Sequence, residues 1–224
     1  MRKSILFLLC CVFVASFSSF AQENDAKSRK GQIGITYSSF GDNDLITSRG
    51  MDGGPSYSGD GFYTFGISYL CPLNNTIDLE TGIEYSKDNL IGHANLPPQS
   101  VIPTYGTSLS LVSLPVLLRV NFLKYCFING GFLFDMDISD SNAIDSQSGV
   151  GAVFGLGLKY AFKCGITVFA NPFSKMHSLV RFSSSQGHQK LMESGFRFGI
   201  MVNLKWAFQQ FRLSLPTKCT YERI

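Results

Sequence analysis

The stretch Thr76-Ile-Asp-Leu-Glu-Thr-Gly-Ile-Glu-Tyr-Ser86 alternates between two kinds of side chain with a period of two residues. One face carries Ile77, Leu79, Thr81, Ile83 and Tyr85, and the other carries Asp78, Glu80, Gly82 and Glu84. This period predicts a β-strand with one apolar and one polar face. A membrane barrel would turn the apolar face toward lipid, whereas a water-soluble barrel would turn it inward.

Similar stretches recur along the chain and predict eight antiparallel strands. They cover residues 31–40, 61–70, 76–86, 108–122, 124–135, 149–162, 164–172 and 194–206. Long connections at 41–60, 87–107, 136–148 and 173–193 alternate with short ones at 71–75, 123 and 163. This alternation is typical of outer-membrane barrels, in which about 9–11 tilted residues cross the bilayer. The sequence therefore predicts an all-β, eight-stranded antiparallel up-and-down transmembrane β-barrel in the cell outer membrane.

The N-terminus predicts export from the cytoplasm. Arg2 and Lys3 precede an apolar run that ends at Phe20, and Ser19-Phe20-Ala21 resembles a signal-peptidase site. We expect residues 1–21 to be a signal peptide, 22–30 a periplasmic segment, 31–206 the barrel and 207–224 a periplasmic tail. No later segment has 18 uninterrupted apolar residues, so a membrane-spanning form would be a barrel.

Composition favours the membrane barrel over the soluble one. Removal of residues 1–21 takes away two basic residues and leaves 17 Lys and Arg against 16 Asp and Glu, which gives no case for nucleic-acid binding. The chain has 20 Phe, nine Tyr and 22 Gly against one Trp. The bulky residues fall on the apolar face, and the polar face is rich in Gly and Ser, as a narrow lumen requires.

Aromatic residues gather near the short-turn ends of the predicted strands, namely Tyr69, Phe122, Tyr125, Tyr160, Phe162, Trp206 and Phe208. Amphipathic rings prefer the headgroup level, so we expect an aromatic girdle at one membrane boundary. The short turns and both termini then face the periplasm, and the long loops face outward.

The strand at 108–122 changes phase along its length. Leu109 and Leu111 share one face, whereas Val112 and the apolar residues that follow it share the other. A β-bulge near Leu111–Val112 would restore one apolar side. Pro115, which cannot donate to a strand ladder, supports a local irregularity.

The chain resembles the small, porin-like outer-membrane β-barrel proteins that are abundant in Bacteroidetes. The resemblance lies in Leu111-Val-Ser-Leu-Pro-Val-Leu-Leu-Arg119, Tyr125-Cys-Phe-Ile-Asn-Gly-Gly131, Gly149-Val-Gly-Ala-Val-Phe-Gly-Leu-Gly157 and Gly195-Phe-Arg-Phe-Gly199. It covers roughly residues 30–206 and implies an eight-stranded outer-membrane barrel without a defined activity. The chain departs from the family because 16 residues follow Phe208, where such barrels usually end.

The polar face predicts a lumen charge network composed of Asp78, Glu80, Glu84, Arg119, Lys159 and Arg197. Counting from the short turns places Glu80 and Arg119 at similar depth on neighbouring strands. The interior of an eight-stranded barrel is just wide enough for side chains to fill, and unpaired buried charges are costly. We therefore expect a lumen sealed by ion pairs, with a selective small-solute pore as the alternative.

An enzyme at the outer rim is a further alternative. His93, His177 and His188 all fall in predicted outer loops. His177 could act as a base with Glu193 as the acid, and Ser178 or a serine of 183–185 could be the nucleophile of a hydrolase or acyltransferase. Serine and histidine are ordinary loop residues, so we predict no catalytic site.

No metal or cofactor site is predicted. The acidic residues of the first loop, Asp42, Asp44, Asp52 and Asp60, lack the order of a calcium-binding loop. Cys71, Cys126, Cys164 and Cys219 contain no Cys-x-x-Cys pair, although Cys126 and Cys164 are candidates for a disulfide.

The predicted function is a structural or surface-interaction role through the long outer loops. The expected partners are outer-membrane lipid and, during biogenesis, the barrel-assembly machinery, and the protein is expected to be a monomer. The loop sequences do not identify an extracellular partner.

Overall fold

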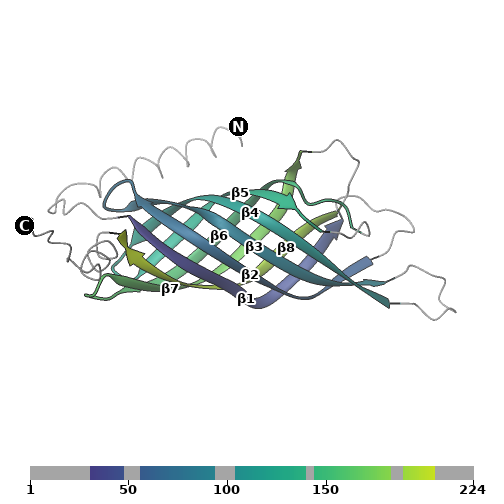
Figure 1. Ribbon diagram of the computed structural model, residues 1–224, viewed down its shortest axis with the longest axis horizontal. Coiled ribbons are helices and arrows are strands. Elements are labelled where there is room, and N and C mark those ends of the chain that lie inside the picture. The colour runs from purple at the N-terminus through teal and green to yellow at the C-terminus, as the bar shows by residue number, and fades with distance from the viewer. Residues whose placement is uncertain (1–30, 48–55, 94–103, 140–143, 183–188, 205–224) are drawn as a thin grey trace, which may run out of the picture.

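The computed structural model describes residues 31–47, 56–93, 104–139, 144–182 and 189–204, and these form a closed β-barrel (Figure 1). Its strands are β1 (Gln32–Thr47), β2 (Ser56–Pro72), β3 (Ile77–His93), β4 (Thr104–Phe122), β5 (Cys126–Asp137), β6 (Gly149–Ala161), β7 (Ile166–Arg181) and β8 (Gln189–Asn203). Each strand pairs antiparallel with its neighbour in sequence, and β1 pairs with β8 to close the ring. The predicted fold class is therefore confirmed.

Short turns join β2 to β3, β4 to β5 and β6 to β7, all at the end of the barrel on the left of Figure 1. The first of these turns is held by Asn74, whose side chain accepts hydrogen bonds from the backbone N–H groups of Thr76 and Ile77 at 2.8 and 2.7 Å. In the turn between β6 and β7, Gly165 has a φ of 84°, which a residue without a Cβ adopts at little cost. The alternation of short and long connections is thus a feature of the fold.

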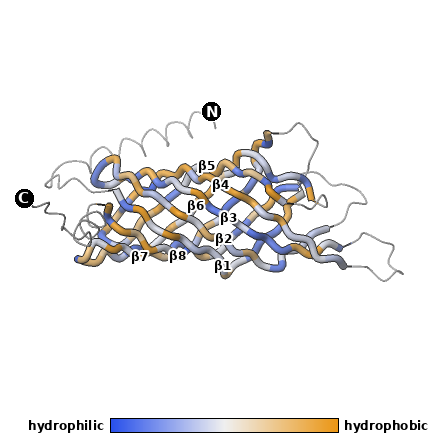
Figure 2. The backbone as a smooth tube through the Cα atoms, in the orientation of Figure 1, coloured by the Kyte–Doolittle hydropathy of each residue, from blue (hydrophilic) through white to orange (hydrophobic). Residues whose placement is uncertain are grey.

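Alternate residues along most of each strand face the lumen and the outer surface. Figure 2 shows hydrophilic and hydrophobic residues alternating along the strands. The residues exposed on the outside are mainly large and apolar, and they include Ile35, Phe65, Ile67, Ile83, Leu118, Phe132, Phe154, Leu156, Phe198 and Ile200. The buried interior holds charged residues, among them Glu80, Arg119 and Arg197, together with small polar ones such as Ser68 and Thr64. This arrangement rules out the water-soluble alternative, in which the apolar face would lie inside.

The strands are longer than the alternation of apolar and polar residues predicted. β3 continues to His93, β4 begins at Thr104 and β7 continues to Arg181, so parts of the predicted long loops belong to strands. In these extensions the outward residues are often polar, for example Lys87 and Asn89 on β3. Backbone pairing therefore continues beyond the apolar band, where the sequence no longer alternates.

The predicted bulge near Leu111–Val112 is wrong. β4 pairs with both neighbours in uninterrupted register through this point. Leu109 and Leu111 point into the lumen and pack against Leu191, whereas Val112 faces outward. The change of phase arises because part of the lumen is apolar. Register shifts occur elsewhere, including one in the β1–β8 pairing between Ser39 and Asp42.

Large lumen aromatics lie over glycines of the neighbouring strand. Phe127 pairs with Gly157, and Phe169 pairs with Gly199. A Cβ added at either glycine would lie 2.2 Å from the nearest carbon of the facing ring. The glycines of the polar face thus make room for rings that cross the lumen. Within the described ranges, no helix is both long and apolar enough to cross a membrane.

Candidate functional site

The centre of the lumen holds a network of buried ion pairs. Arg119 contacts Glu80 through Nη2 at 2.7 Å, and Arg197 contacts the other oxygen of the same carboxylate at 2.9 Å. Arg197 also lies 3.6 Å from Glu84, which accepts a hydrogen bond from Lys175 Nζ at 2.8 Å. These side chains come from β3, β4, β7 and β8, so the network crosses the barrel interior and links strands that are not neighbours.

Aromatic rings flank this network on the short-turn side. The guanidinium carbon of Arg119 lies 4.1 Å from the centroid of the Phe127 ring and 4.9 Å from that of Phe169. Cations above ring faces are attracted by the negative charge of the π-system. Phe127 and Phe169 pack edge to face, with their centroids 5.9 Å apart. The rings therefore both pack the lumen and hold the Arg119 guanidinium.

A second buried cluster surrounds His177. Its Nδ1 lies 2.9 Å from Asp135 and its Nε2 lies 2.9 Å from Glu193. Asp135 also accepts a hydrogen bond from the Ser113 hydroxyl at 2.6 Å, and Glu193 lies 3.9 Å from Lys175. The shared Lys175 connects this cluster to the central ion pairs, so the two form one continuous polar band.

Apolar layers bound the polar band on both sides. Leu70, Phe127, Phe169 and Met201 form a buried cluster near the short-turn end. Leu109, Leu111 and Leu191 form another toward the opposite end, with Leu45 packed against it. A third group, Leu117, Leu133 and Val153, lines one wall. Apolar and charged side chains thus occupy successive levels of the described part of the lumen.

The structure distributes the six predicted network residues over two levels. Glu80, Glu84, Arg119 and Arg197 meet in the central network. Asp78 and Lys159 lie nearer the short turns, where both contact Asn121. The Asn121 amide donates to Asp78 at 2.6 Å, and Lys159 donates to its carbonyl oxygen.

Five buried ionisable lumen residues were not predicted from the sequence, namely Asp88, Asp135, Lys175, His177 and Glu193. The inward direction of some of these residues could have been recognised from the alternation of inward and outward positions along the strands. Asp88 continues the even-numbered series of Asp78, Glu80 and Glu84 along β3. Lys175 and His177 likewise continue the inward series of β7, but they lay in a segment that was predicted to be a loop.

The predicted positions of two histidines were wrong. His177 lies inside β7 and is fully buried, and His93 ends β3, where its Nε2 lies 3.1 Å from the Ser58 hydroxyl. Both nitrogens of His177 contact carboxylates, so neither is available to activate a nucleophile. His188 and the serines 183–185 lie outside the described residues. The geometry around His177 therefore gives the rim-enzyme alternative no support.

Metal and disulfide chemistry are equally unsupported in the described ranges. No group of three or more His, Cys, Asp and Glu side chains among them is arranged to hold a metal ion. Cys71, Cys126 and Cys164 are free thiols, so the candidate pair Cys126 and Cys164 is not bonded. Cys219, the signal peptide and the C-terminal tail lie outside the described residues.

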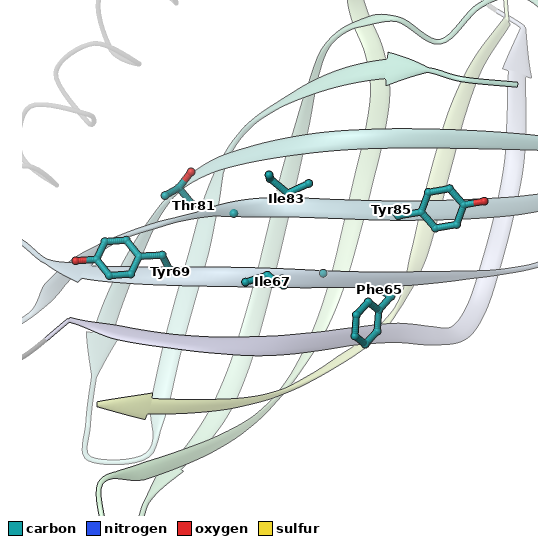
Figure 3. Close-up of a pocket in the computed structure, with 8 residues that line it drawn as sticks. Phe65, Ile67, Tyr69, Thr81, Ile83 and Tyr85 are labelled. Carbon is teal, nitrogen blue, oxygen red and sulfur yellow. The ribbon is translucent and has the colours of Figure 1, made fainter. Parts of the chain in front are cut away.

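The outer surface has the character of a lipid-facing wall. Figure 3 shows one shallow apolar hollow between β2 and β3, with Ile67 and Ile83 at its middle, Tyr69 and Thr81 toward one end, and Phe65 and Tyr85 toward the other. Near the short turns, Tyr125 stacks on Tyr160 with ring centroids 6.1 Å apart. Exposed aromatic rings at one level mark a membrane boundary.

A closed ring of antiparallel strands with an apolar outside and a polar inside defines a transmembrane β-barrel. Single-chain bacterial barrels of this kind, with short turns at one end and longer connections at the other, are outer-membrane proteins. The chain is thus an eight-stranded β-barrel protein of the cell outer membrane.

Comparison with known proteins gives distant structural likenesses. No protein-family model matches the chain, and no curated protein matches it. Outer membrane protein AlkL, whose structure was determined by solid-state NMR in lipid bilayers, is 10% identical with a TM-score of 0.39, over 81% of this chain and 93% of AlkL. The translocator domain of the autotransporter NalP from Neisseria meningitidis is 11% identical with a TM-score of 0.31, over 91% and 98% of the two chains. The NanC porin is 9% identical with a TM-score of 0.25, over 79% and 100%. At such scores the assignment rests on this chain's own strand pairing and surface.

Proposed function

We propose that the protein is a non-conducting outer-membrane scaffold whose extended strands and long connections make contacts at the cell surface. The observation that supports this proposal is the packing of side chains in the described part of the lumen. Two apolar layers enclose a band in which Glu80, Glu84, Arg119, Lys175 and Arg197 form ion pairs with one another. A stable water column would need these side chains to separate, and buried charges without partners are costly.

The surface-contact part of the proposal is supported by the strand extensions. At the end of the barrel opposite the short turns, Asp42, Asp44 and Asp60 are exposed. Tyr57 and Tyr105 pack edge to face there, and their hydroxyls lie 3.0 Å apart. A paired sheet that continues above the apolar band offers a rigid base for contacts with molecules outside the cell.

Conductance in planar bilayers tests the proposal. Insertion is first verified by the change in gel migration on boiling, which reports a closed barrel. The wild-type protein is expected to give no steady current across the usual range of voltages. Steady, ion-selective current from the inserted wild-type protein would instead establish the small-solute pore as its function.

A further inference from the structure

The outer face of β7 forms a groove between two strands with larger outward side chains. Val168, Ala170 and Pro172 face outward on β7. Val168 lies between Tyr160 of β6 and Ile200 of β8, and Ala170 lies between Leu158 and Phe198. Because the Ala170 side chain is only a methyl group, an apolar hollow remains beside it. Its lining includes Leu158, Tyr160, Val168, Ala170 and Phe198. We call this hollow the β7 groove.

The β7 groove is long enough to hold part of an acyl chain within one leaflet of the membrane. Its floor on β7 runs from Val168 to Ala170, a rise of about 7 Å at 3.3 Å per residue, and the outer face of β7 continues to Pro172. The hydrocarbon core of a bilayer is about 30 Å thick, so one leaflet occupies about half of this. A segment of a linear acyl chain therefore fits along the floor, between the walls formed by β6 and β8.

The end of the β7 groove near the short turns carries aromatic rings and positive charge. The ring of Tyr160 lies between Tyr125, at 6.1 Å, and Phe162, at 4.8 Å. Lys124 and Lys163 are exposed in the adjacent turns, and Lys124 Nζ lies 5.3 Å from the centroid of the Tyr125 ring. The described short turns, 73–76, 123–125 and 162–165, contain no acidic residue. Short turns of such barrels face the periplasm, so these lysines lie at the headgroups of the inner leaflet.

We propose that the β7 groove is a binding site for an anionic phospholipid of the inner leaflet, such as phosphatidylglycerol. One acyl chain lies over Ala170, and the phosphate lies at the headgroup level near Lys124 and Lys163. Each lysine near the membrane surface contributes about a fivefold preference for an anionic headgroup. The hollow between β2 and β3 has no such feature, because neither its lining nor the adjacent turn 73–76 contains a lysine or arginine.

Native mass spectrometry of the full-length mature barrel tests this site. The detergent-solubilised protein is titrated with phosphatidylglycerol and with phosphatidylcholine of the same acyl chains. We expect one tightly held phosphatidylglycerol per barrel, bound about 30-fold more tightly than phosphatidylcholine. Ala170→Phe should fill the groove and weaken binding at least tenfold, whereas Ala152→Phe, the same change on the outer face of β6, should not.

The charge requirement is tested separately. Lys124→Gln combined with Lys163→Gln should remove the preference for phosphatidylglycerol, whereas Lys87→Gln combined with Lys190→Gln, far from the short turns, should retain it. The comparison of these two double variants tests the site even if Ala170→Phe does not fold. Equal affinity for the two lipids, or wild-type binding by Ala170→Phe, would refute the site. A dimer that Ala170→Phe abolishes would show that a second copy of the chain occupies the groove.

Discussion

Arg119 donates hydrogen bonds from both Nε and Nη2 to the same oxygen of Glu80, at 3.0 and 2.7 Å. The second oxygen of Glu80 contacts Arg197 at 2.9 Å, so one carboxylate neutralises part of the charge of two guanidinium groups. All three side chains are buried. The central network therefore depends on Glu80 more than on any other acid in it.

Arg119→Ala should destabilise the barrel by about 3–5 kcal/mol, because it leaves the Glu80 carboxylate with an incomplete set of buried partners. Unfolding in urea, followed by the loss of the compact gel band, measures the change. Lys190→Ala, which removes a cation from the outer face of β8, is the control and should stay within about 0.5 kcal/mol of the wild type. Equal stability of the two variants would mean that the lumen is hydrated and its charges are screened.

Glu80→Gln should cost more stability than Glu84→Gln, although both remove one buried negative charge. Without Glu80, the Arg119 guanidinium loses its only ion-pair contact within 4.0 Å among the described residues. Without Glu84, Lys175 keeps Glu193 at 3.9 Å and Arg197 keeps Glu80 at 2.9 Å. The same urea titrations give the order, and the reverse order would show that the second contacts of Lys175 and Arg197 carry little energy.

Much of this barrel could be predicted from the sequence because lipid and lumen impose opposite demands on alternate residues. From the alternation within the apolar band, the fold, the strand order and the inward direction of Glu80 and Arg119 could be predicted. The alternation disappears in the strand extensions, where the outside is polar, and His177 and Glu193 were therefore assigned to a loop. Leu109 and Leu111 suggested a bulge that does not exist, because they are apolar residues that face inward, in an apolar layer of the lumen.

Lumen contacts between strands that are not neighbours could not be predicted from the sequence. Lys175 and Glu84 are 91 residues apart and lie on β7 and β3, which do not pair. The curvature and closure of the barrel bring them together, and neither residue periodicity nor loop length encodes that distance. The pairing of Glu80 with Arg119 could be predicted because their strands are neighbours in both sequence and space.

Gly157→Ala should destabilise the barrel by about 1–3 kcal/mol, the usual cost of overpacking a filled core. The added methyl group would lie 2.2 Å from Cζ of Phe127, which is itself held between Arg119 and Phe169. Gly106→Ala is the matched control, because a Cβ at Gly106 meets nothing within 4 Å. Phe127→Leu in the Gly157→Ala background should recover part of the loss. No difference between the two glycine variants would show that the Phe127 ring moves away freely.

The orientation of the barrel predicts which thiols react on living cells. Cys164 is exposed in the short turn between β6 and β7, whereas Asp44 is exposed near the opposite end of β1. In a Cys219→Ser background, a membrane-impermeant maleimide should label an Asp44→Cys variant on intact cells. Cys164 should react only after the outer membrane has been permeabilised, because short turns face the periplasm. Labelling of Cys164 on intact cells would show that the barrel has the opposite orientation. Lys124 and Lys163 would then not lie at the inner leaflet.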